Sequence, residues 1–359
     1  MYKRQAVVFY EAEKTPGKSS MAVIDKVGGK WTVVYNINSE YSDVYSISFS
    51  DLTGDGVNEF IVLWDVISNS VNHVLYVYAQ NLSGEYSLSP IGSELTVNNC
   101  ITVDMDLDTV NEMLAFTIES GDSVSSTATL YEYSLNGRET LGRTKLDGHI
   151  SYYSDIQYNV DEDRVYIYAD AVKSDGTQML TEVIYWSDYY DTIISPFYSY
   201  SNGTTSSTVR SSMISCDDVD DDGIIEIPTD VQMDDIPSDV KAVEWNTYND
   251  SVLVTACYSL VVQKDQYQLI IPDEYFDEIK VLYSPESSFL TVTDDNDNSL
   301  FSVMCVLKAH YNPSSSAYKG FSEIDESSGY VYLAQEGESG NADFSVQSVK
   351  SMIRTDKGE

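Results

Sequence analysis

The stretch that decides the fold is residues 51–64, which read DLTGDGVNEFIVLW: a nine-residue acidic loop followed by an apolar run. The same order recurs twice. DMDLDTVNE begins at Asp104 and precedes MLAF, and DVDDDGIIE begins at Asp218 and precedes IPT. Each loop places oxygen-bearing side chains at its positions 1, 3, 5 and 9. Recurrence at a fixed period is the sequence signature of a repeat architecture, so the repeat length is the next question.

The spacing of the loops gives the repeat length. Asp51 and Asp104 are 53 residues apart, and Asp104 and Asp218 are 114 apart, which is twice 57. A further loop is therefore expected near residue 161, where NVDEDRVYIYADA begins at Asn159. Alignment puts Arg164 in the place of the last loop carboxylate, and a cation there would oppose a bound cation. We interpret this unit as a repeat without a metal. One unit earlier, AVVFYEA aligns with FIVLWDV, which makes five visible units.

Short alternating segments separated by Gly, Asn, Asp and Ser clusters fill the space between the loops, as in WTVVYNI from Trp31. Units of about 50–60 residues built only from short strands are typical of propeller blades with four strands. We therefore expect a mainly β protein, with a partial β-propeller of about five blade repeats over residues 6–262. The period ends there, and residues 263–359 predict a small α+β domain. Asp343 is expected to cap its last helix, which would bury Val349 and Met352.

Residues 1–5 read MYKRQ and occupy the place where the first unit should have its acidic loop. They resemble the translation of a sequencing-library transposon end read from a GTG start. We interpret them as a sequencing-adapter artefact that replaces native sequence, so that the chain is truncated at its N-terminus; a genuine basic N-terminus is the alternative.

Composition excludes several classes of protein. The 58 acids against 20 bases give a net charge of −38, which argues against nucleic acid or an anionic membrane as partner. The apolar share of 42% and 29 tyrosines argue against disorder. No apolar run approaches the ~20 residues that span a bilayer, so no transmembrane segment is expected. The four cysteines lack C-x-x-C pairing and predict buried thiols, with one disulfide as the alternative.

Oxygen ligands at alternate positions of a tight loop suit calcium (Ca2+) better than magnesium, which prefers to keep its waters. Position 7 would add a backbone carbonyl, and a strand follows in place of the second helix of an EF-hand. Metal-free acidic β-turns are the alternative. We expect up to three structural calcium sites, of which the Asp218 loop is the strongest because it has four carboxylates and Gly223. The predicted ligands are Asp51, Thr53, Asp55, Val57 and Glu59; Asp104, Asp106, Asp108, Val110 and Glu112; and Asp218, Asp220, Asp222, Ile224 and Glu226.

The pattern D-x-[DT]-x-D-G-x-x-E before an apolar strand resembles the FG-GAP/VCBS repeats of integrin-like propellers. The run SCDDVDDDGIIEIP, which ends at Pro228, is similar to a signature of FG-GAP lipoproteins of Firmicutes, especially clostridia. The resemblance covers residues 6–262 and implies structural calcium, export and lipid anchoring at the cell surface. It breaks at Arg164. The order YQLIIPDEYF, LFSVMCV and VYLA in the remainder resembles the C-terminal domain of the same lipoproteins, which implies no chemistry.

Two functions remain open from the sequence. The first is a non-enzymatic extracellular calcium-binding protein, monomeric, that scaffolds or binds protein or glycan. The second is a calcium-dependent carbohydrate-active enzyme of the polysaccharide-lyase kind, which would need a base and a cleft with convergent Arg, Lys, His and aromatic residues. The sequence shows no such cluster, so we expect no catalytic residues and favour the first function.

Overall fold

The computed structural model describes residues 5–66, 69–81, 87–119, 125–161, 164–249 and 252–355. Strands dominate these residues and helices are few, which confirms a mainly β protein. The chain divides into two compact units, Met1–Ser207 and Thr208–Glu359. β-Strands on both sides of Val262 pair in one sheet.

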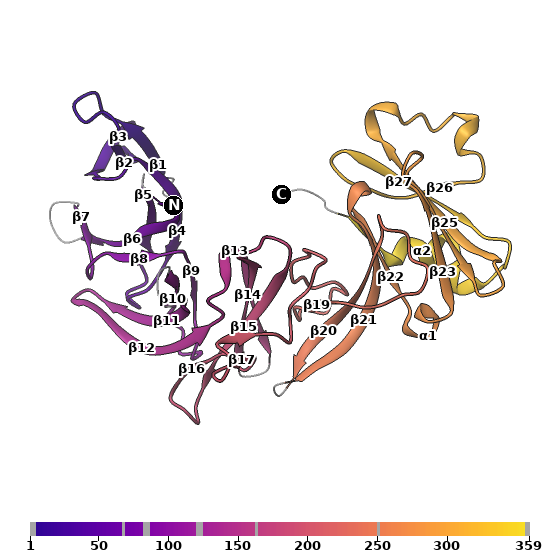
Figure 1. Ribbon diagram of the computed structural model, residues 1–359. Coiled ribbons are helices and arrows are strands. Elements are labelled where there is room, and N and C mark those ends of the chain that lie inside the picture. Colours follow the sequence, from indigo (N-terminus) through magenta and orange to yellow (C-terminus); the bar gives the residue numbers. More distant parts are fainter. Residues whose placement is uncertain are drawn as a thin grey trace. The chain divides into compact units, whose positions relative to one another are not determined.

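The first unit consists of consecutive antiparallel sheets in which neighbours in sequence pair with each other, apart from β8, which pairs with β6 (Figure 1). The first sheet has β1 (Ala6–Glu11), β2 (Ser19–Val27) and β3 (Lys30–Asn38), and the second has β4 (Asp43–Ser50), β5 (Glu59–Val66), β6 (Asn69–Asn81), β7 (Ser87–Pro90) and β8 (Leu95–Val97). The third has β9 (Asn99–Val103), β10 (Glu112–Glu119), β11 (Ser125–Ser134) and β12 (Gly137–Leu146), and the fourth has β13 (Ile150–Asp161), β14 (Arg164–Lys173), β15 (Met179–Ser187) and β16 (Thr192–Ile194). A short pair, β17 (Tyr198–Ser199) and β18 (Thr204–Thr205), follows.

Strand β5, which contains the FIVLW run, is buried on both of its faces. Phe60, Val62 and Trp64 pack with residues of the first sheet, and the Trp64 ring meets Phe9 edge-on at 5.8 Å. Ile61 alternates with them and packs with the third sheet. A strand covered on both faces reads as a continuous apolar run rather than as an alternating one, which explains why the sequence has five apolar residues in succession.

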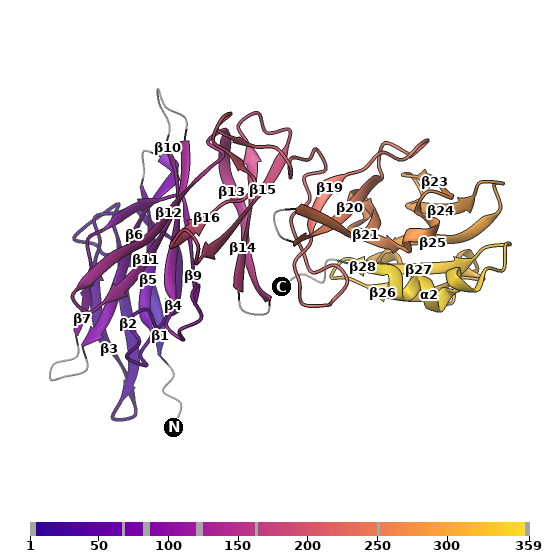
Figure 2. The ribbon, with the colours of Figure 1, turned by 90° about the horizontal axis from the view of Figure 1, so that it is seen from below.

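The same packing continues from the third sheet to the fourth. The Phe116 ring of β10 lies 4.8 Å from the Tyr153 ring of β13, whose hydroxyl is 2.6 Å from Ser126 Oγ. At Gly142 a side chain would meet Thr192 of β16, since a Cβ there would lie 2.6 Å from Thr192 Oγ1. The four larger sheets of the first unit therefore pack against one another in chain order (Figures 1 and 2).

The fourth repeat departs from the acidic-loop pattern in its backbone as well as in its sequence. Asn159 and Asp161 already belong to β13, and Asp161 pairs directly with Arg164. The predicted acidic turn therefore closes a hairpin rather than a nine-residue loop; its residues 162 and 163 lie outside the described residues. Arg164 begins β14 as Glu59 begins β5, and its guanidinium lies 5.1 Å from the centre of the Tyr185 ring.

The second unit has two five-stranded antiparallel sheets that share one core. The fifth sheet has β19 (Ile227–Asp230), β20 (Lys241–Asn249), β21 (Val252–Val262), β22 (Tyr267–Ile271) and β28 (Ile353–Thr355). The sixth has β23 (Ile279–Ser284), β24 (Phe289–Asp294), β25 (Ser299–Leu307), β26 (Ser322–Glu326) and β27 (Tyr330–Glu336). Two short helices, α1 (Asp273–Phe276) and α2 (Val346–Met352), accompany the sheets, together with 3-10 turns at Gln263–Asp265, Lys308–His310, Ser316–Tyr318 and Ala342–Phe344.

Helix α2 buries the face that the sequence predicts. Val349 and Met352 lie in the core of the second unit. The predicted cap is wrong: Ser345 caps the helix, because its side chain accepts a hydrogen bond from the Ser348 N–H. Asp343 belongs instead to the preceding 3-10 turn.

The four cysteines lie among the described residues and form no disulfide there, and three of them are buried. Burial raises the pKa of the Cys257 and Cys305 thiols to about 12, so both remain protonated at neutral pH. This agrees with the predicted buried thiols rather than with the alternative of a disulfide.

No helix among the described residues is long and apolar enough to cross a bilayer.

Shortening a side chain of β5 tests whether the strand is buried on both faces. Leu63 is 2% exposed and packs between the second and third sheets. Leu63→Ala should lower the free energy of unfolding by about 2–5 kcal/mol, because it removes buried methyl groups and leaves a cavity. Chemical denaturation measures the change, and Tyr189→Ala, at a residue 87% exposed, is the control expected to stay within about 0.5 kcal/mol. Equal effects of the two substitutions would contradict the packing described.

A buried carboxyl on β15 makes the first unit sensitive to pH. Glu182 is fully buried and accepts hydrogen bonds from the Asp147 N–H at 2.7 Å, from Ser195 Oγ at 3.0 Å and from Thr205 Oγ1 at 3.0 Å. Burial nevertheless raises the pKa of Glu182 to about 7. The folded state therefore holds a proton that the unfolded state has lost above pH ~4.3.

Stability should accordingly fall as pH rises from about 4.5 to about 7, and this contribution should be constant above that range. Glu182→Gln has no proton to lose, so its denaturation midpoint should fall less between pH 5 and pH 8 than that of the parent. The exposed Glu132→Gln is the control and should behave as the parent does. An unchanged pH dependence in Glu182→Gln would contradict this role.

Candidate metal centres

The three acidic loops have the same backbone conformation. In each of them, positions 4 and 6 adopt the left-handed region that favours glycine. These residues are Gly54 and Gly56 (φ 69° and 81°), Leu107 and Thr109 (62° and 82°), and Asp221 and Gly223 (64° and 89°). Two left-handed residues separated by one position turn the chain sharply, so that the side chains of the loop can converge. The loops that the sequence aligns by their carboxylates are therefore also alike in shape.

The glutamate at position 9 closes each loop. Its Oε2 atom accepts the N–H of position 2 in all three cases, and position 2 is a buried apolar residue. The Leu52 N–H donates to Glu59 at 2.8 Å, the Met105 N–H donates to Glu112 at 2.8 Å, and the Val219 N–H donates to Glu226 at 3.0 Å. The apolar side chain anchors the loop in the core, and the carboxylate joins the loop's beginning to its end.

Backbone amides orient the carboxylates at positions 1 and 5. Position 1 accepts the N–H of position 6 at 2.8 Å in Asp51, 2.9 Å in Asp104 and 2.9 Å in Asp218. Position 5 accepts the N–H of position 7, at 2.8 Å, from Val57, Val110 and Ile224. The bonds of position 5 are Asx turns, in which an aspartate accepts the N–H two residues on, and acidic loops form them with or without a metal.

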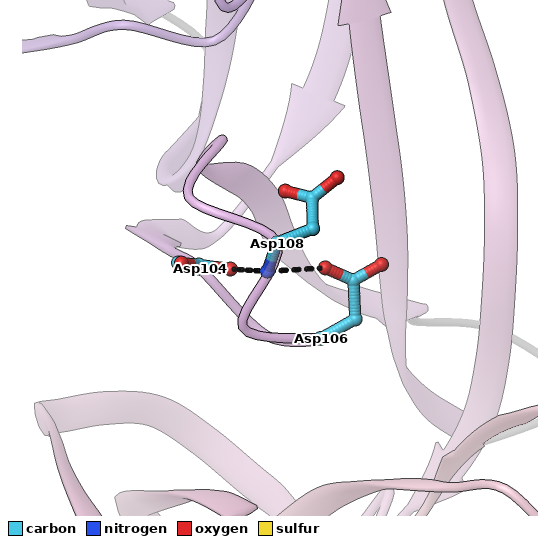
Figure 3. Close-up of side chains that lie close together, drawn as sticks. All are labelled: Asp104, Asp106 and Asp108. Atoms are coloured by element: carbon cyan, nitrogen blue, oxygen red, sulfur yellow. Dashed lines mark hydrogen bonds between the residues drawn. The ribbon is translucent and has the colours of Figure 1, made fainter.

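In the second and third loops, the backbone N–H of position 5 makes additional hydrogen bonds to the carboxylates of positions 1 and 3. The Asp108 N–H donates to Asp104 Oδ1 at 2.9 Å and to Asp106 Oδ1 at 3.3 Å, and Figure 3 shows this nitrogen between the two carboxylates. Asp222, at the same position of the third loop, makes the corresponding bonds at 3.0 and 3.3 Å. Both position-1 oxygens are thus engaged in these loops.

Two of the three predicted sites bring three acids together within 4.8 Å of one another. They are Asp104, Asp106 and Asp108 in the second loop, and Asp218, Asp220 and Glu226 in the third. Glu112 and Asp222 are not in these groups. In the first loop Asp51, Asp55 and Glu59 form no such group, although all three are among the described residues, and Thr53 Oγ1 lies 3.4 Å from Glu59 Oε1.

The position-9 carboxyls are buried beside like charges. Burial, together with a smaller effect of the aspartates in each loop, raises the pKa of Glu112 and of Glu226 to about 7. The pKa of Glu59 is raised for the same reasons. Carboxylates that lie close together in a partly buried loop repel one another and lose hydration. A proton or a cation compensates this cost, and a divalent cation would compensate it for several carboxylates at once.

Two buried oxygens support the fit to a cation. Asp51 Oδ1 and Glu226 Oε1 are inaccessible to water and have no hydrogen-bond partner among the described residues. A buried oxygen without a partner costs about 1–3 kcal/mol, and more when it is charged. Carboxylate oxygens are also the donors that calcium takes. The third loop has both such an oxygen and three acids close together, so its donor set suits a hard divalent ion; the first loop has the oxygen without the group of acids.

The first and second loops contact each other across neighbouring sheets. Asn111 Nδ2 donates to Ser50 Oγ at 2.9 Å, and the Asn111 N–H reaches the Asp51 carbonyl at 3.4 Å. A Cβ at Gly54 would lie 3.0 Å from Val110 Cγ2. The loops therefore sit where the second and third sheets meet. The sequence could have indicated Asn111, because Asn58 also precedes a loop glutamate.

Arg354 of β28 is a residue of the third site that sequence reasoning missed. Its Nε donates to the Val219 carbonyl at 3.1 Å, and its Nη2 lies 3.4 Å from Asp221 Oδ2. No local pattern connects Arg354 with a loop more than a hundred positions earlier in the chain. The contact exists because β28 pairs with β22 in the fifth sheet.

A comparison of this chain with protein-family models finds no match, and a comparison with curated proteins finds none either.

Position 6 offers a test of the loop conformation. Thr109 is a β-branched residue at φ 82°, where the other two loops have glycine. Such backbone strain costs about 1–3 kcal/mol. Thr109→Gly should therefore stabilise the first unit, and Gly223→Thr should destabilise the second by a similar amount, as measured by chemical denaturation. Loss of stability in Thr109→Gly would show that the second loop does not need a left-handed residue there.

Proposed function

We propose that this chain is a non-enzymatic, extracellular calcium-binding protein that uses a rigid β-propeller to present binding surfaces. The observation that carries the proposal is the common frame of the three acidic loops: the position-9 glutamate accepts from position 2, and the aspartates at positions 1 and 5 accept from positions 6 and 7. Acidic turns without a common role would be expected to differ in these hydrogen bonds, so their repetition in three loops supports a shared role.

Two features support a radial arrangement of the sheets. Each of the second and third sheets is covered on both faces by its neighbours in the chain, as in the blades of a propeller. The first strands of the second and fourth sheets carry half-exposed aromatic residues, namely Tyr45 and Phe49 on β4 and Tyr152 and Tyr158 on β13. In a propeller the first strand of each blade lines the central channel, and these rings would face it.

Calcium in the loops would be structural. In the second loop Asp104, Asp106 and Asp108 would hold the ion together with Glu112, and in the third loop Asp218, Asp220 and Glu226 would hold it. The bound ion would neutralise the clustered carboxylates and stiffen the loop. Because the first and second loops touch through Asn111, loop order would also fix the contact between neighbouring sheets.

The setting that suits such loops is extracellular. Extracellular modules bind calcium with dissociation constants of about 10⁻⁴–10⁻³ M, and sites of this affinity are occupied only where calcium is abundant. Export and lipid anchoring at the cell surface follow from the resemblance to FG-GAP lipoproteins, as does a partner of the protein or glycan class. The acidic surface fits a partner that is not itself strongly anionic.

Calcium binding is tested by thermal denaturation and calorimetry with and without chelator. At 10 mM calcium, dissociation constants of about 10⁻⁴–10⁻³ M correspond to roughly 1.4–2.7 kcal/mol of stabilisation per site. Glu226→Gln should remove the effect on the second unit, because it deletes the buried charge at the strongest site. The exposed Glu338→Gln is the matched control. A melting temperature that millimolar calcium leaves unchanged would refute the proposal.

A further inference from the structure

The first unit contains a pocket that the acidic loops do not explain. It has a volume of about 590 Å³ and opens over the third sheet. This volume lies within the range of about 300–1,000 Å³ that small-ligand sites have. Its lining combines two cations, one carboxylate, three hydroxyl side chains and one tyrosine: Arg143, Lys145, Glu119, Ser125, Thr127, Thr144 and Tyr200.

The two cations are positioned by β12. Arg143 and Lys145 are two residues apart on this strand, so both side chains project from the same face of the sheet. They pair with Thr129 and Thr127 of β11. Arg143 Nη2 donates to Thr127 Oγ1 at 3.2 Å, and Thr127 Oγ1 lies 3.2 Å from Thr117 Oγ1. The guanidinium is thus held in place and retains further donors for a ligand.

The aromatic wall of the pocket is exposed. Tyr200 is 74% exposed, although its ring meets the Tyr198 ring edge-on at 5.0 Å. An aromatic residue this exposed loses little by covering a ligand and gains the burial of its ring face. Close packing of Gly142 against Thr192 holds β12 beside β16, and Tyr200 follows β16 by a short length of chain.

The chemistry of these groups matches a sugar ring. Arg143 and Lys145 donate hydrogen bonds, Glu119 accepts them, and Ser125 Oγ, which donates to Glu119 Oε2 at 3.0 Å, can accept them as well. Tyr200 offers an apolar surface to the C–H face of a pyranose. A strongly anionic ligand fits less well, because Glu119 lies in the pocket and the chain carries a net charge of −38.

We propose that this pocket binds a neutral pyranose unit of a glycan. The inference rests on the proposed binding function and narrows its ligand to neutral carbohydrate. Tyr200 stacks on the sugar, and Arg143, Lys145 and Glu119 hydrogen-bond to its hydroxyls. The sequence could not reveal the site, because its residues come from three strands and one loop and follow no common spacing.

The test is native affinity electrophoresis of the full chain in 5 mM calcium, with galactomannan, glucomannan, mixed-linkage β-glucan, amylose or polygalacturonate in the gel. At least one neutral polysaccharide should slow the parent chain. Tyr200→Ala and Arg143→Gln should each weaken this retention about tenfold or more, as central aromatic and arginine contacts do. The controls are Tyr189→Ala and Lys30→Gln, which change exposed residues outside the pocket and should be slowed as the parent is.

The outcomes separate this inference from the proposed function. Equal retention of the parent and of Tyr200→Ala and Arg143→Gln would overturn the pocket and leave glycan binding standing. Retention by polygalacturonate that depends on Arg143 would overturn the neutral ligand, and retention by no neutral polysaccharide would overturn the inference as a whole. Calcium stabilisation is measured on the same variants and should be unchanged by Tyr200→Ala. If the parent chain itself shows no calcium stabilisation, that result would count against the proposed function alone.

Discussion

The constraint on which the first unit depends is that its inner sheets are buried on both faces. β5 shows it most directly: Phe60 and Trp64 pack toward one sheet while Ile61 and Leu63 pack toward the other. A strand in this position cannot present a polar face to water, so its polar groups are confined to its ends. The acidic loops occupy those ends, directly before the buried strand, and this location sets both their anchoring by a buried position-2 residue and the burial of their glutamates.

The loop frame and the sheet packing support each other. A loop closed through Glu59 or Glu112 fixes where the next buried strand begins, and hence which of its residues face each neighbouring sheet. The charge that this arrangement concentrates is what makes a cation suitable there. The fourth sheet begins the corresponding strand at Arg164, which pairs with Asp161, so the packing does not require an acidic loop at every repeat.

Local features were predictable from the sequence and distant ones were not. The loops' glycines, aspartates and glutamates act within nine residues, and the buried face of α2 follows from helical spacing. The pairing of Leu269 with Ile353 could not be anticipated, because the two strands are far apart in the chain and their pairing has no periodic signal. The helix cap failed for a different reason: Asp343 and Ser345 are both good capping residues, and only the backbone conformation decides between them.

Arg354 has a consequence for how the second unit can be altered. The residue comes from the last described strand, yet it hydrogen-bonds the backbone of the third acidic loop. Shortening or fusing the chain at that end would therefore disturb a carboxylate loop remote from the edit. Any engineering of this unit therefore has to keep β28 and the third acidic loop together, because the Arg354 guanidinium joins them.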